Sequence, residues 1–376
     1  MLYFLQFSYI PNVASTNRLL AYYSALDKMG IKATAIYLMP DSERNKIKYS
    51  YNHINIIYLW EKVFLYNRYS KFFYYKYFIW KLKRKFQPGD NVYTYDISLL
   101  TKIATDINGV NVFCERTEHP EANKQFVSRL IALSEDEMWA TYRKVKGLFV
   151  ISTPLYNYFV EQGIEKNRVH IINMIVDPAR FLGLKKHENV EKYIAYCGTA
   201  SNNKDGVDEL LKSFSIVTQK FNDIRLYIIG NTPDITDSAG NIKLIEELGI
   251  KDKVKFLGIV AAENIPQILK NAMVLALDRP DSIQAKHGFP TKLGEYLLTE
   301  NPVVITKVGD IPKFLKDGIN ALLAEERNAK EFASKLIWAL THTKEAAEIG
   351  KNGAQLAQKE FNNEIECKKI LDAIFS

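Results

Sequence analysis

The sequence is poor in the residues that build disulfide-linked or metal-held folds. It has only three cysteines, Cys114, Cys197 and Cys367, and six histidines in 376 residues. The cysteines are odd in number and far apart, which argues against a disulfide or zinc framework. We therefore expect reduced thiols in a reducing compartment, and no metal site.

Long hydrophobic runs are also lacking. No stretch approaches the ~18 uninterrupted apolar residues of a membrane-spanning helix. The apolar start at residues 1–5 has no basic residues before it and stops at Ser8 without a small-residue cleavage site, unlike a signal peptide. These absences predict a buried first strand and a cytoplasmic protein without a transmembrane helix.

What the sequence has is a globular balance of apolar and charged residues with an uneven distribution of charge. Apolar residues make up 47% and charged residues 25%, and a chain of 376 residues predicts two domains. Residues 1–180 hold 24 Lys/Arg and 16 Asp/Glu, a balance of +8, whereas the remainder holds 26 and 27, a balance of −1. The first half is therefore the one expected to meet an anionic partner.

Short apolar runs alternate with helical patterns along the whole chain, which predicts parallel α/β sheets. In the first half we predict a helix over 15–29 and strands over 2–6, 33–38, 91–95, 110–113 and 148–151. The pattern restarts near residue 176, with a helix over 206–221 and strands over 193–197, 225–229, 254–257, 274–277 and 303–306. We predict domains at 1–175 and 176–357, and a carboxyl-terminal helix within 358–376 that packs back on the first.

Residues 60–86 form a basic aromatic segment unlike the rest of the chain. They hold twelve aromatic residues, eight Lys/Arg and one acid, Glu61. Such a composition suits an amphipathic helix at an anionic membrane surface, with the four cations of residues 81–85 on lipid phosphates. The alternative is a core helix with a solvated basic edge. Nucleic-acid binding is not expected, because no RNA-binding signature accompanies the segment.

Two loops of the second half have features of phosphate-binding sites. A strand ends at Gly198-Thr199, and a polar loop with Lys204 leads into a helix, so backbone N–H groups and an ammonium can meet an anion. The stretch 288–296 (GFPTKLGEY) places Thr291 as a helix N-cap and Lys292 in the first turn, with Glu295 one turn further on.

The order of these motifs resembles the retaining GT-B glycosyltransferases grouped as glycosyltransferase family 4. The similarity rests on residues 204–207 (KDGV), 295–298 (EYLL) and 301–304 (NPVV) followed by 309–312 (GDIP). It covers most of residues 145–340 and is weaker before them. It implies a GT-B fold, in which two Rossmann-like domains with parallel sheets face a central cleft.

The resemblance also implies roles for individual residues. Lys204 would bind the donor diphosphate, Glu295 the ribose, and His119 would stand near the sugar, so these three are the candidate catalytic residues. The candidate donor-binding residues are Gly198, Thr199, Lys204, Arg279, His287, Gly288, Phe289, Pro290, Thr291, Lys292 and Glu295. On the acceptor side the candidates are Asn12, Ser15 and Glu118 in the loops of the first domain.

Two positions depart from the family pattern. Thr199 stands where the family has an arginine, and His287 where it has the first glutamate of its Glu-x7-Glu segment. Arg279 or Lys292 is expected to supply the missing positive charge. A family subgroup with a Thr-Lys pair at this place fits the sequence better, and there the pair would bind phosphate.

The predicted function is transfer of a sugar from a nucleotide-sugar, UDP-linked in preference to GDP-linked, to a hydroxyl of a lipid-linked or oligosaccharide acceptor. The resemblance implies retention of configuration, and the setting expected is capsule, exopolysaccharide or O-antigen synthesis at the inner face of the cell membrane. The nucleotide-sugar is a substrate, and no cofactor or metal is expected. The alternatives are a non-catalytic GT-B subunit, a sugar-nucleotide-binding protein and a sugar-nucleotide epimerase.

Overall fold

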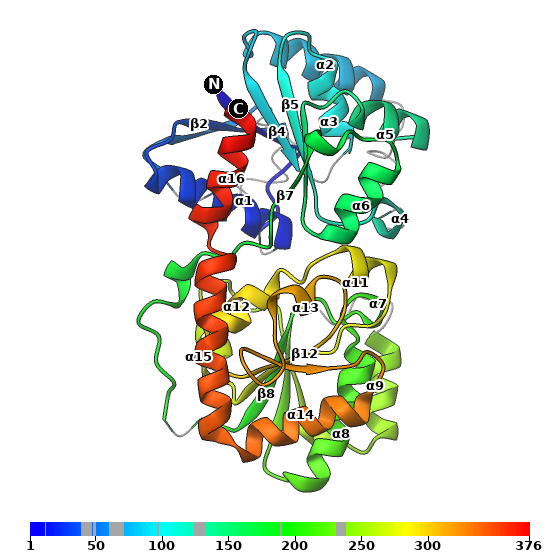
Figure 1. Cartoon of the computed structure of the whole chain (residues 1–376), viewed down its shortest axis with the longest axis vertical. Helices are drawn as coiled ribbons and strands as arrows, with labels where there is room; N and C mark the ends of the chain where they lie inside the picture. Colours follow the sequence, from blue (N-terminus) through cyan, green and yellow to red (C-terminus); the bar gives the residue numbers. More distant parts are fainter. Residues whose placement is uncertain are drawn as a thin grey trace. The chain divides into compact units, whose positions relative to one another are not determined.

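The computed structural model describes two compact units of α/β structure. Residues 1–11, 13–38, 47, 50–59, 71–95, 98–123, 133–188, 190–230 and 238–376 are described. The first unit is Met1–Asn173 together with Asn363–Ser376, and the second is Met174–Asn362. Each unit has its own sheet, and each is described separately below (Figure 1).

The first unit contains a parallel sheet of seven strands in the order β3-β2-β1-β4-β5-β6-β7. This is the strand order of a Rossmann-type sheet. The order in which strands are added reverses between β1 and β4, and all strands stay parallel. The strands are β1 (Leu2–Gln6), β2 (Ala33–Tyr37), β3 (Ile54–Tyr58), β4 (Asn91–Tyr95), β5 (Asn111–Arg116), β6 (Gly147–Val150) and β7 (Val169–Ile171).

Helices from both ends of the chain cover this sheet. They are α1 (Ala14–Lys28), α2 (Lys71–Lys83), α3 (Ser98–Thr105), α4 (Pro120–Asn123), α5 (Glu135–Tyr142), α6 (Thr153–Glu161) and α16 (Asn363–Phe375). The carboxyl-terminal α16 packs against α1, where the Asn363 amide donates to Ala21 O at 3.0 Å (Figure 1). The last helix of the chain is therefore part of the first unit.

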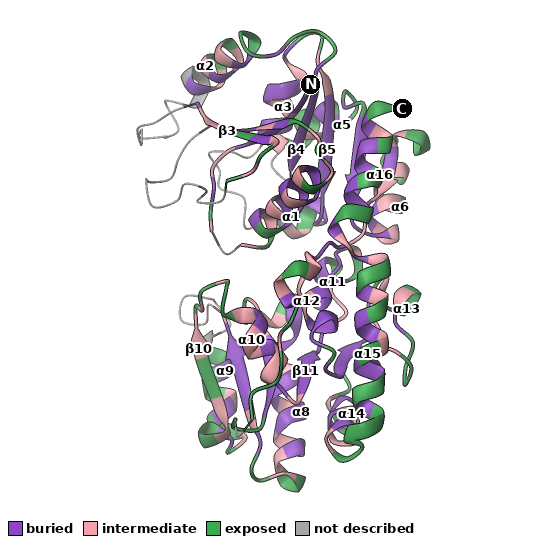
Figure 2. Cartoon of the chain, turned by 90° about the vertical axis from the view of Figure 1, so that its left-hand side faces the viewer, coloured by how far each residue is buried: buried purple, intermediate pink, exposed green. Residues whose placement is uncertain are grey.

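The second unit repeats the same strand order in a parallel sheet of six strands, β10-β9-β8-β11-β12-β13. The strands are β8 (Tyr193–Cys197), β9 (Arg225–Ile229), β10 (Val254–Gly258), β11 (Val274–Leu277), β12 (Val303–Thr306) and β13 (Leu322–Ala324). The central strands β8, β11 and β12 are buried on both faces (Figure 2). Burial on both faces explains their continuous apolar sequences.

The helices of the second unit are α7 (Asn202–Asp205), α8 (Val207–Lys220), α9 (Ser238–Glu247), α10 (Ile265–Asn271), α11 (Ile283–His287), α12 (Lys292–Leu298), α13 (Ile311–Phe314), α14 (Ala329–Thr341) and α15 (Thr343–Glu360). Helix α8 packs on α14, and α12 packs on α15. Gly350 on α15 allows close approach to the turn after α12, because a Cβ there would lie 2.2 Å from Glu300 O.

Two sequence expectations are corrected by the pairing of strands. β5 continues past Phe113 through Glu115 and Arg116, since these charged residues still pair with β4 and β6. Strands β3, β7 and β13 are not among those predicted, and each lies at the edge of its sheet. β7 and β13 have three residues each, too few for an alternating pattern to be recognised.

The described part of the basic aromatic segment is helix α2 and the turn that follows it. Residues 60–70 lie outside the described residues. Tyr74, Phe78 and Leu82 follow at intervals of four and are buried, whereas Trp80 is 49% exposed. The Arg84 guanidinium lies 4.0 Å from the Trp80 ring. The helix therefore has both a core face and an exposed basic aromatic face. Across the described part of the chain, no helix has the length and apolarity needed to cross a membrane.

Candidate functional site

A cluster of four charged residues and one tyrosine lies at the carboxyl ends of β8 and β11, in the second unit. We call it the Asp205 cluster, and it comprises Tyr196, Lys204, Asp205, Arg279 and Lys292. Ligands of parallel α/β sheets bind at the carboxyl ends of strands beside the point where the strand order reverses. In this sheet that point lies between β8 and β11.

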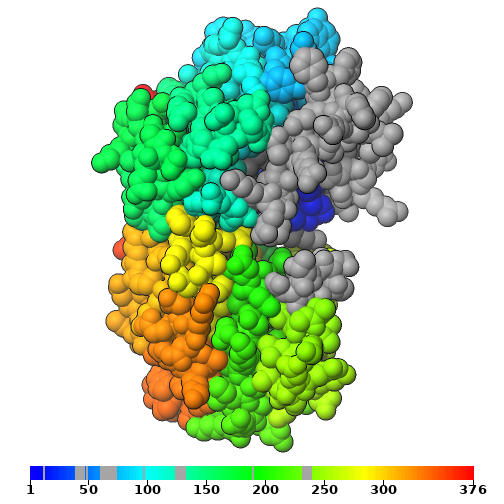
Figure 3. All heavy atoms as spheres, turned by 90° about the vertical axis from the view of Figure 1, so that its right-hand side faces the viewer, coloured from blue at the N-terminus to red at the C-terminus, as the bar shows by residue number. Residues whose placement is uncertain are grey.

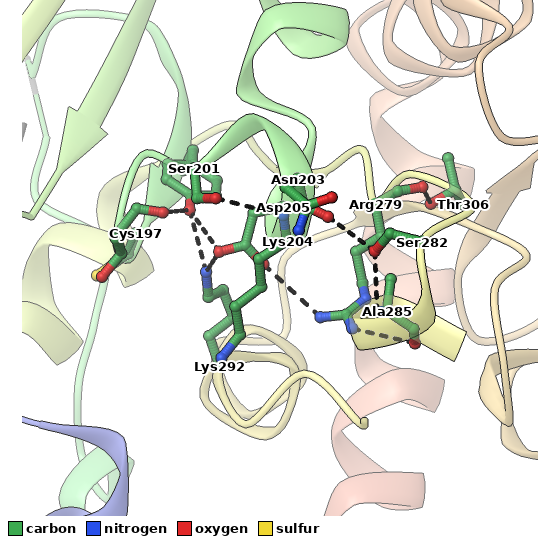
Figure 4. Close-up of polar contacts among 12 residues, drawn as sticks. Cys197, Ser201, Asn203, Lys204, Asp205, Arg279, Ser282, Ala285, Lys292 and Thr306 are labelled. Carbon is green, nitrogen blue, oxygen red and sulfur yellow. Dashed lines mark hydrogen bonds and ion pairs between the residues drawn. The ribbon is translucent and has the colours of Figure 1, made fainter. Parts of the chain in front are cut away.

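One buried carboxylate holds the cluster together. Asp205 is 1% exposed, and its Oδ2 accepts hydrogen bonds from Lys292 Nζ at 2.6 Å and from the Tyr196 hydroxyl at 2.8 Å. Its Oδ1 lies 3.6 Å from Arg279 Nη1. Figure 4 shows the lysine and arginine approaching Asp205 from different elements. Two cations thus pair with a single carboxylate, and the nearby charge of Lys204 acts on it as well.

The ionisation of these groups reflects their shared burial. Burial alone would raise the pKa of the Asp205 carboxyl, but Lys292, Arg279 and Lys204 together hold it below its ordinary value. Burial lowers the pKa of the Lys292 ammonium, and the Asp205 carboxylate offsets part of that effect. Burial also raises the pKa of the Tyr196 hydroxyl, and Asp205 raises it further, so the hydroxyl stays protonated. The cluster keeps an excess of positive charge.

Two glycines make room for this arrangement. A Cβ on Gly198, whose φ is +152°, would lie 2.2 Å from Lys292 Nζ. A Cβ on Gly206, whose φ is +62°, would lie 1.8 Å from Asp278 O. Gly206 must be glycine, because a side chain would collide with the backbone after β11. A side chain at Gly198 would displace the Lys292 ammonium from its place. Gly206 also ends α7 and starts α8, which places Asp205 at the turn.

Backbone and hydroxyl contacts fix Arg279 on its loop. Arg279 is 1% exposed, and its Nη2 donates to Ala285 O at 3.2 Å. The Thr306 hydroxyl at the end of β12 donates to Arg279 O at 2.7 Å. Ser282 caps α11 and donates to Asn203 O at 2.8 Å, so α11 lies beside α7 on the surface of the second unit (Figure 3).

Helix α12 starts where the sequence predicts, but its first residues act differently. It begins at Lys292, with Thr291 in the N-cap position. Thr291 has helical backbone angles and its side chain makes no capping hydrogen bond, so the expected side-chain cap is corrected. Lys292 turns to Asp205 and Tyr196, with Nζ 4.6 Å from the centre of the tyrosine ring.

Glu295, the candidate ribose ligand, is paired with an arginine that was not among the predicted site residues. Arg180 belongs to the 3-10 helix η3 (Pro178–Phe181), and it donates to Glu295 and, at 3.0 Å, to Ala262 O. Nearby, Cys197 N donates to the Tyr296 hydroxyl at 2.6 Å, which joins β8 to α12. Arg180 therefore orients the carboxylate expected to meet the ribose.

Most of the remaining donor-side candidates lie in and after α11. His287 ends α11, with Nδ1 3.0 Å from Ile283 O, and Gly288 follows it as the C-cap. The Phe289 ring packs at 5.6 Å from both Phe314 and Phe361. Pro290 is buried, and its carbonyl accepts from Leu293 N at 3.0 Å. The Thr199 side chain is exposed in the loop after β8.

The acceptor-side candidates belong to the first unit. His119 follows β5 and is buried, with its ring 4.1 Å from that of Tyr158. Its Nδ1 accepts a hydrogen bond from Glu121 N at 3.3 Å, so Nε2 carries the proton in the neutral ring. Glu118 is half-buried beside it, and Ser15 is half-buried in the first turn of α1. Asn12 lies outside the described residues.

Sequence reasoning missed Asp205, Tyr196 and Arg180. Asp205 sits inside the Lys-Asp-Gly motif, where a single acid before a glycine reads as an ordinary turn residue. Only the tertiary structure brings it to Lys292, 87 residues later in the chain. Within the described ranges, no group of three or more His, Cys, Asp or Glu could hold a metal ion.

Comparison with known proteins finds a family model that matches part of the second unit. The sequence model of the family described as Glycosyl transferases group 1 matches residues 184–356, which lie within the second unit. Mannosylfructose-phosphate synthase from Agrobacterium fabrum is 22% identical over 215 residues, or 54% of this chain and 46% of that protein. The chain thus aligns with less than half the length of this curated relative.

Solved structures share the whole architecture. Anabaena HepE in complex with UDP and glucose has a TM-score of 0.74 at 15% identity, with 100% of this chain and 99% of that chain covered. The lipopolysaccharide outer core galactosyltransferase WaaB has a TM-score of 0.68 at 15% identity, with 100% and 99% covered. At this identity the likeness shows the fold, which is GT-B.

Proposed function

We propose that this protein is a glycosyltransferase that moves a sugar from a nucleotide-sugar donor to a hydroxyl of a saccharide acceptor. The observation that carries the proposal is the Asp205 cluster, in which two cations pair with one carboxylate and Lys204 adds a third positive charge. The cluster lies within the residues that match the model of Glycosyl transferases group 1. An excess of buried positive charge at this place suits a diphosphate. UDP-sugars are favoured, because HepE was solved with UDP and with UDP-glucose.

The chemistry requires stabilisation of a leaving diphosphate. Breakage of the bond between the anomeric carbon and the diphosphate oxygen leaves negative charge on that oxygen. Lys204 and Lys292 would stabilise this charge, and Glu295 would accept hydrogen bonds from the ribose hydroxyls. Such preorganised donors act without reorganisation as the charge develops. In this proposal the nucleotide-sugar is a substrate, and no metal or cofactor takes part.

The first unit would supply the acceptor side. His119, with a proton on Nε2 in its neutral form, is the candidate to contact the transferred sugar, and Glu118, Ser15 and Asn12 are the candidates to meet the acceptor. The acceptor hydroxyl must stand beside the anomeric carbon before the bond breaks, since the sugar cation is short-lived. Retention of configuration is part of the proposal through the resemblance to family 4.

A lipid-linked acceptor in surface polysaccharide synthesis is the acceptor we favour. Helix α2 presents exposed basic residues, Lys76 and Lys83, beside the exposed Trp80. A basic and aromatic face of this kind suits peripheral contact with an anionic membrane surface. The relative WaaB acts in the lipopolysaccharide outer core, by its name.

The first experiment is a panel of UDP-, GDP-, ADP- and dTDP-sugars, tested for donor hydrolysis and thermal shift with the wild type and with Lys204→Ala. We expect a selective response to one nucleotide that the variant loses and that chelation with EDTA leaves unchanged. Lys335→Met, which breaks an ion pair with Asp317 on the same unit, is the matched control. No response to any sugar nucleotide would refute the proposal.

Membrane contact is tested separately by vesicle sedimentation. We expect the wild type to bind vesicles that contain phosphatidylglycerol and not vesicles of phosphatidylcholine alone. A variant with Lys76→Glu, Trp80→Ala and Lys83→Glu should lose binding and keep donor hydrolysis. Equal sedimentation of wild type and variant would exclude α2 as the contact.

A second candidate function is a non-catalytic subunit of the same fold. Two observations favour it: Thr199 replaces the family arginine, and His287 replaces the glutamate expected at the donor sugar. A wild type that binds a nucleotide-sugar tightly but neither hydrolyses it nor transfers its sugar would support this candidate over the enzyme.

A further inference from the structure

The second unit buries a carboxylate in the middle of the cations that the proposed donor site requires. Asp205 is almost fully buried, so it is not available to contact a donor itself. Both of its oxygens are turned to cations, Oδ2 to Lys292 at 2.6 Å and Oδ1 to Arg279 at 3.6 Å. The negative charge of an acid beside a diphosphate site would weaken anion binding. Such an acid favours binding only if it has another effect on the site that is larger than this repulsion.

We propose that Asp205 is a positioning residue for donor binding, which holds the Lys292 ammonium at the strand ends before the diphosphate arrives. This inference rests on the proposed function, because it assigns a role within the same donor site. It extends that function to a residue that touches neither donor nor acceptor.

The need for a positioning residue follows from the chemistry of lysine. A lysine side chain is long and flexible, and fixing it costs rotamer entropy. Lys292 enters from the first turn of α12, and no capping bond from Thr291 restrains that turn. A lysine fixed only on ligand binding would take this cost from the binding free energy.

Three contacts restrain the Lys292 ammonium. Lys292 Nζ donates to Asp205 at 2.6 Å and to the Tyr196 hydroxyl at 3.1 Å, and it lies over the tyrosine ring. The Tyr196 hydroxyl in turn lies 2.8 Å from Asp205 Oδ2. The absence of a side chain at Gly198 leaves the space that the ammonium fills. The lysine is therefore held in one place by elements far apart in the sequence.

The charge count leaves the cluster attractive to an anion. Arg279 is buried by its loop and stays near Asp205, while Lys204 lowers the pKa of both Asp205 and Lys292 through its charge. With three cations and one carboxylate, Asp205 orders the site and does not neutralise it.

The experiment is a double-mutant cycle of Asp205→Asn and Lys292→Met, with UDP and inorganic pyrophosphate as the titrants in calorimetry. We expect each single variant to bind UDP about tenfold more weakly, and the double variant to be no weaker than Lys292→Met alone, because contacting residues are not additive. Pyrophosphate should show the same pattern. Transfer assays should show that Asp205→Asn has a lower kcat and a higher KM for the nucleotide-sugar donor than the wild type.

Two further variants keep the test decisive. Asp278→Asn controls for the change from carboxyl to amide at a buried site, since Asp278 is equally buried and lies 3.4 Å from Ser213 instead of facing Lys292; it should bind UDP like the wild type. If Asp205→Asn does not fold, Tyr196→Phe removes the shared hydroxyl and keeps both charges. It should weaken UDP binding about threefold in the wild type and not at all in Lys292→Met.

The outcomes separate this inference from the proposed function. Losses that add in the double variant would overturn the positioning role while leaving the donor site intact. Tighter UDP binding by Asp205→Asn would overturn it too, because Asp205 would then act only as a competing anion. A wild type that binds neither UDP nor any other nucleoside diphosphate would refute the proposed function itself, and the inference with it.

Discussion

Each unit buries a carboxylate near the carboxyl ends of its strands, but the two surroundings differ. In the first unit Glu115, at the end of β5, accepts from Arg18 Nε at 2.7 Å and from the Tyr22 and Tyr93 hydroxyls. Arg18 also donates to Ile172 O at 3.3 Å and to Asn173 O, so this ion pair lies among tyrosine hydroxyls and backbone carbonyls. In the second unit, Asp205 lies within ion-pair distance of two cations, Lys292 and Arg279, and the charge of Lys204 acts on it as well.

We interpret the Glu115–Arg18 pair as a structural ion pair and the Asp205 cluster, with its excess of positive charge, as a preorganised binding site. In a buried pair the two charges compensate each other, and removing one partner leaves the other uncompensated. An excess of cations costs folding free energy that an anionic ligand can offset. The contrast predicts that the Glu115 pair governs stability and that the Asp205 cluster governs affinity.

The largest effect on stability is expected from Glu115→Gln. The substitution leaves the Arg18 charge buried without its carboxylate, which typically costs about 3–5 kcal/mol. Urea denaturation should show this loss in the free energy of unfolding, whereas the affinity for UDP below the transition should stay within about twofold of the wild type. A loss below ~1 kcal/mol would show that the pair is not structural.

Lys292→Met should have the largest effect on catalysis. Removal of one preorganised cation from the departing diphosphate is expected to lower kcat by about 10²–10³. Single-turnover transfer assays measure this, with Lys335→Met as the control at an ion pair on α14. A kcat unchanged by Lys292→Met would place the diphosphate away from the Asp205 cluster.

Asp278 offers a third arrangement, a buried carboxyl that faces acids. Burial and the charges of Glu209 and Asp208 raise the pKa of the Asp278 carboxyl, and Ser213 and Lys212 oppose them only in part. The resulting pKa is about 8. The folded state therefore binds a proton that the unfolded state releases, and wild-type stability should fall as pH rises from about 4 to 8. Asp278→Asn should remove at least ~2 kcal/mol of that fall, measured by denaturation at pH 5 and pH 9. If the free energy of unfolding changed with pH by the same amount in the wild type and in Asp278→Asn, this prediction would be wrong.

Arg180→Met should have a smaller effect, confined to ligands that contain ribose. Loss of the charge-assisted hydrogen bond frees the Glu295 carboxylate, and UDP affinity should fall about tenfold. Pyrophosphate has no ribose and should bind as to the wild type. A loss for both ligands would mean that Arg180 acts through the fold instead.

The smallest effect is expected at an exposed pair. Lys28 and Glu364 are 45% and 46% exposed and lie 3.2 Å apart, between α1 and α16. Lys28→Met should change the free energy of unfolding by no more than about 0.5 kcal/mol. A larger change would mean that the docking of α16 depends on this contact.

Much of the secondary structure could be predicted because the central strands are apolar on both faces. The bounds of β1, β4, β8, β9, β11 and β12 agree with the predicted ranges. Prediction failed where strands are short or charged. β7 and β13 are three-residue edge strands, and Glu115 and Arg116 extend β5 although charged residues usually end a strand. Their partners come from elements distant in the sequence, so no local pattern marks them.

The sequence by itself determined the two parallel α/β sheets, because alternating strand and helix patterns follow from local hydrophobic periodicity. It also placed Lys204 near a helix start after a buried strand, and Lys292 and Glu295 in the first turn of another helix. The tertiary structure alone decided which groups meet. Asp205 with Lys292 and Arg180 with Glu295 are pairs separated by 87 and 115 residues, and a local pattern carries no information about such contacts.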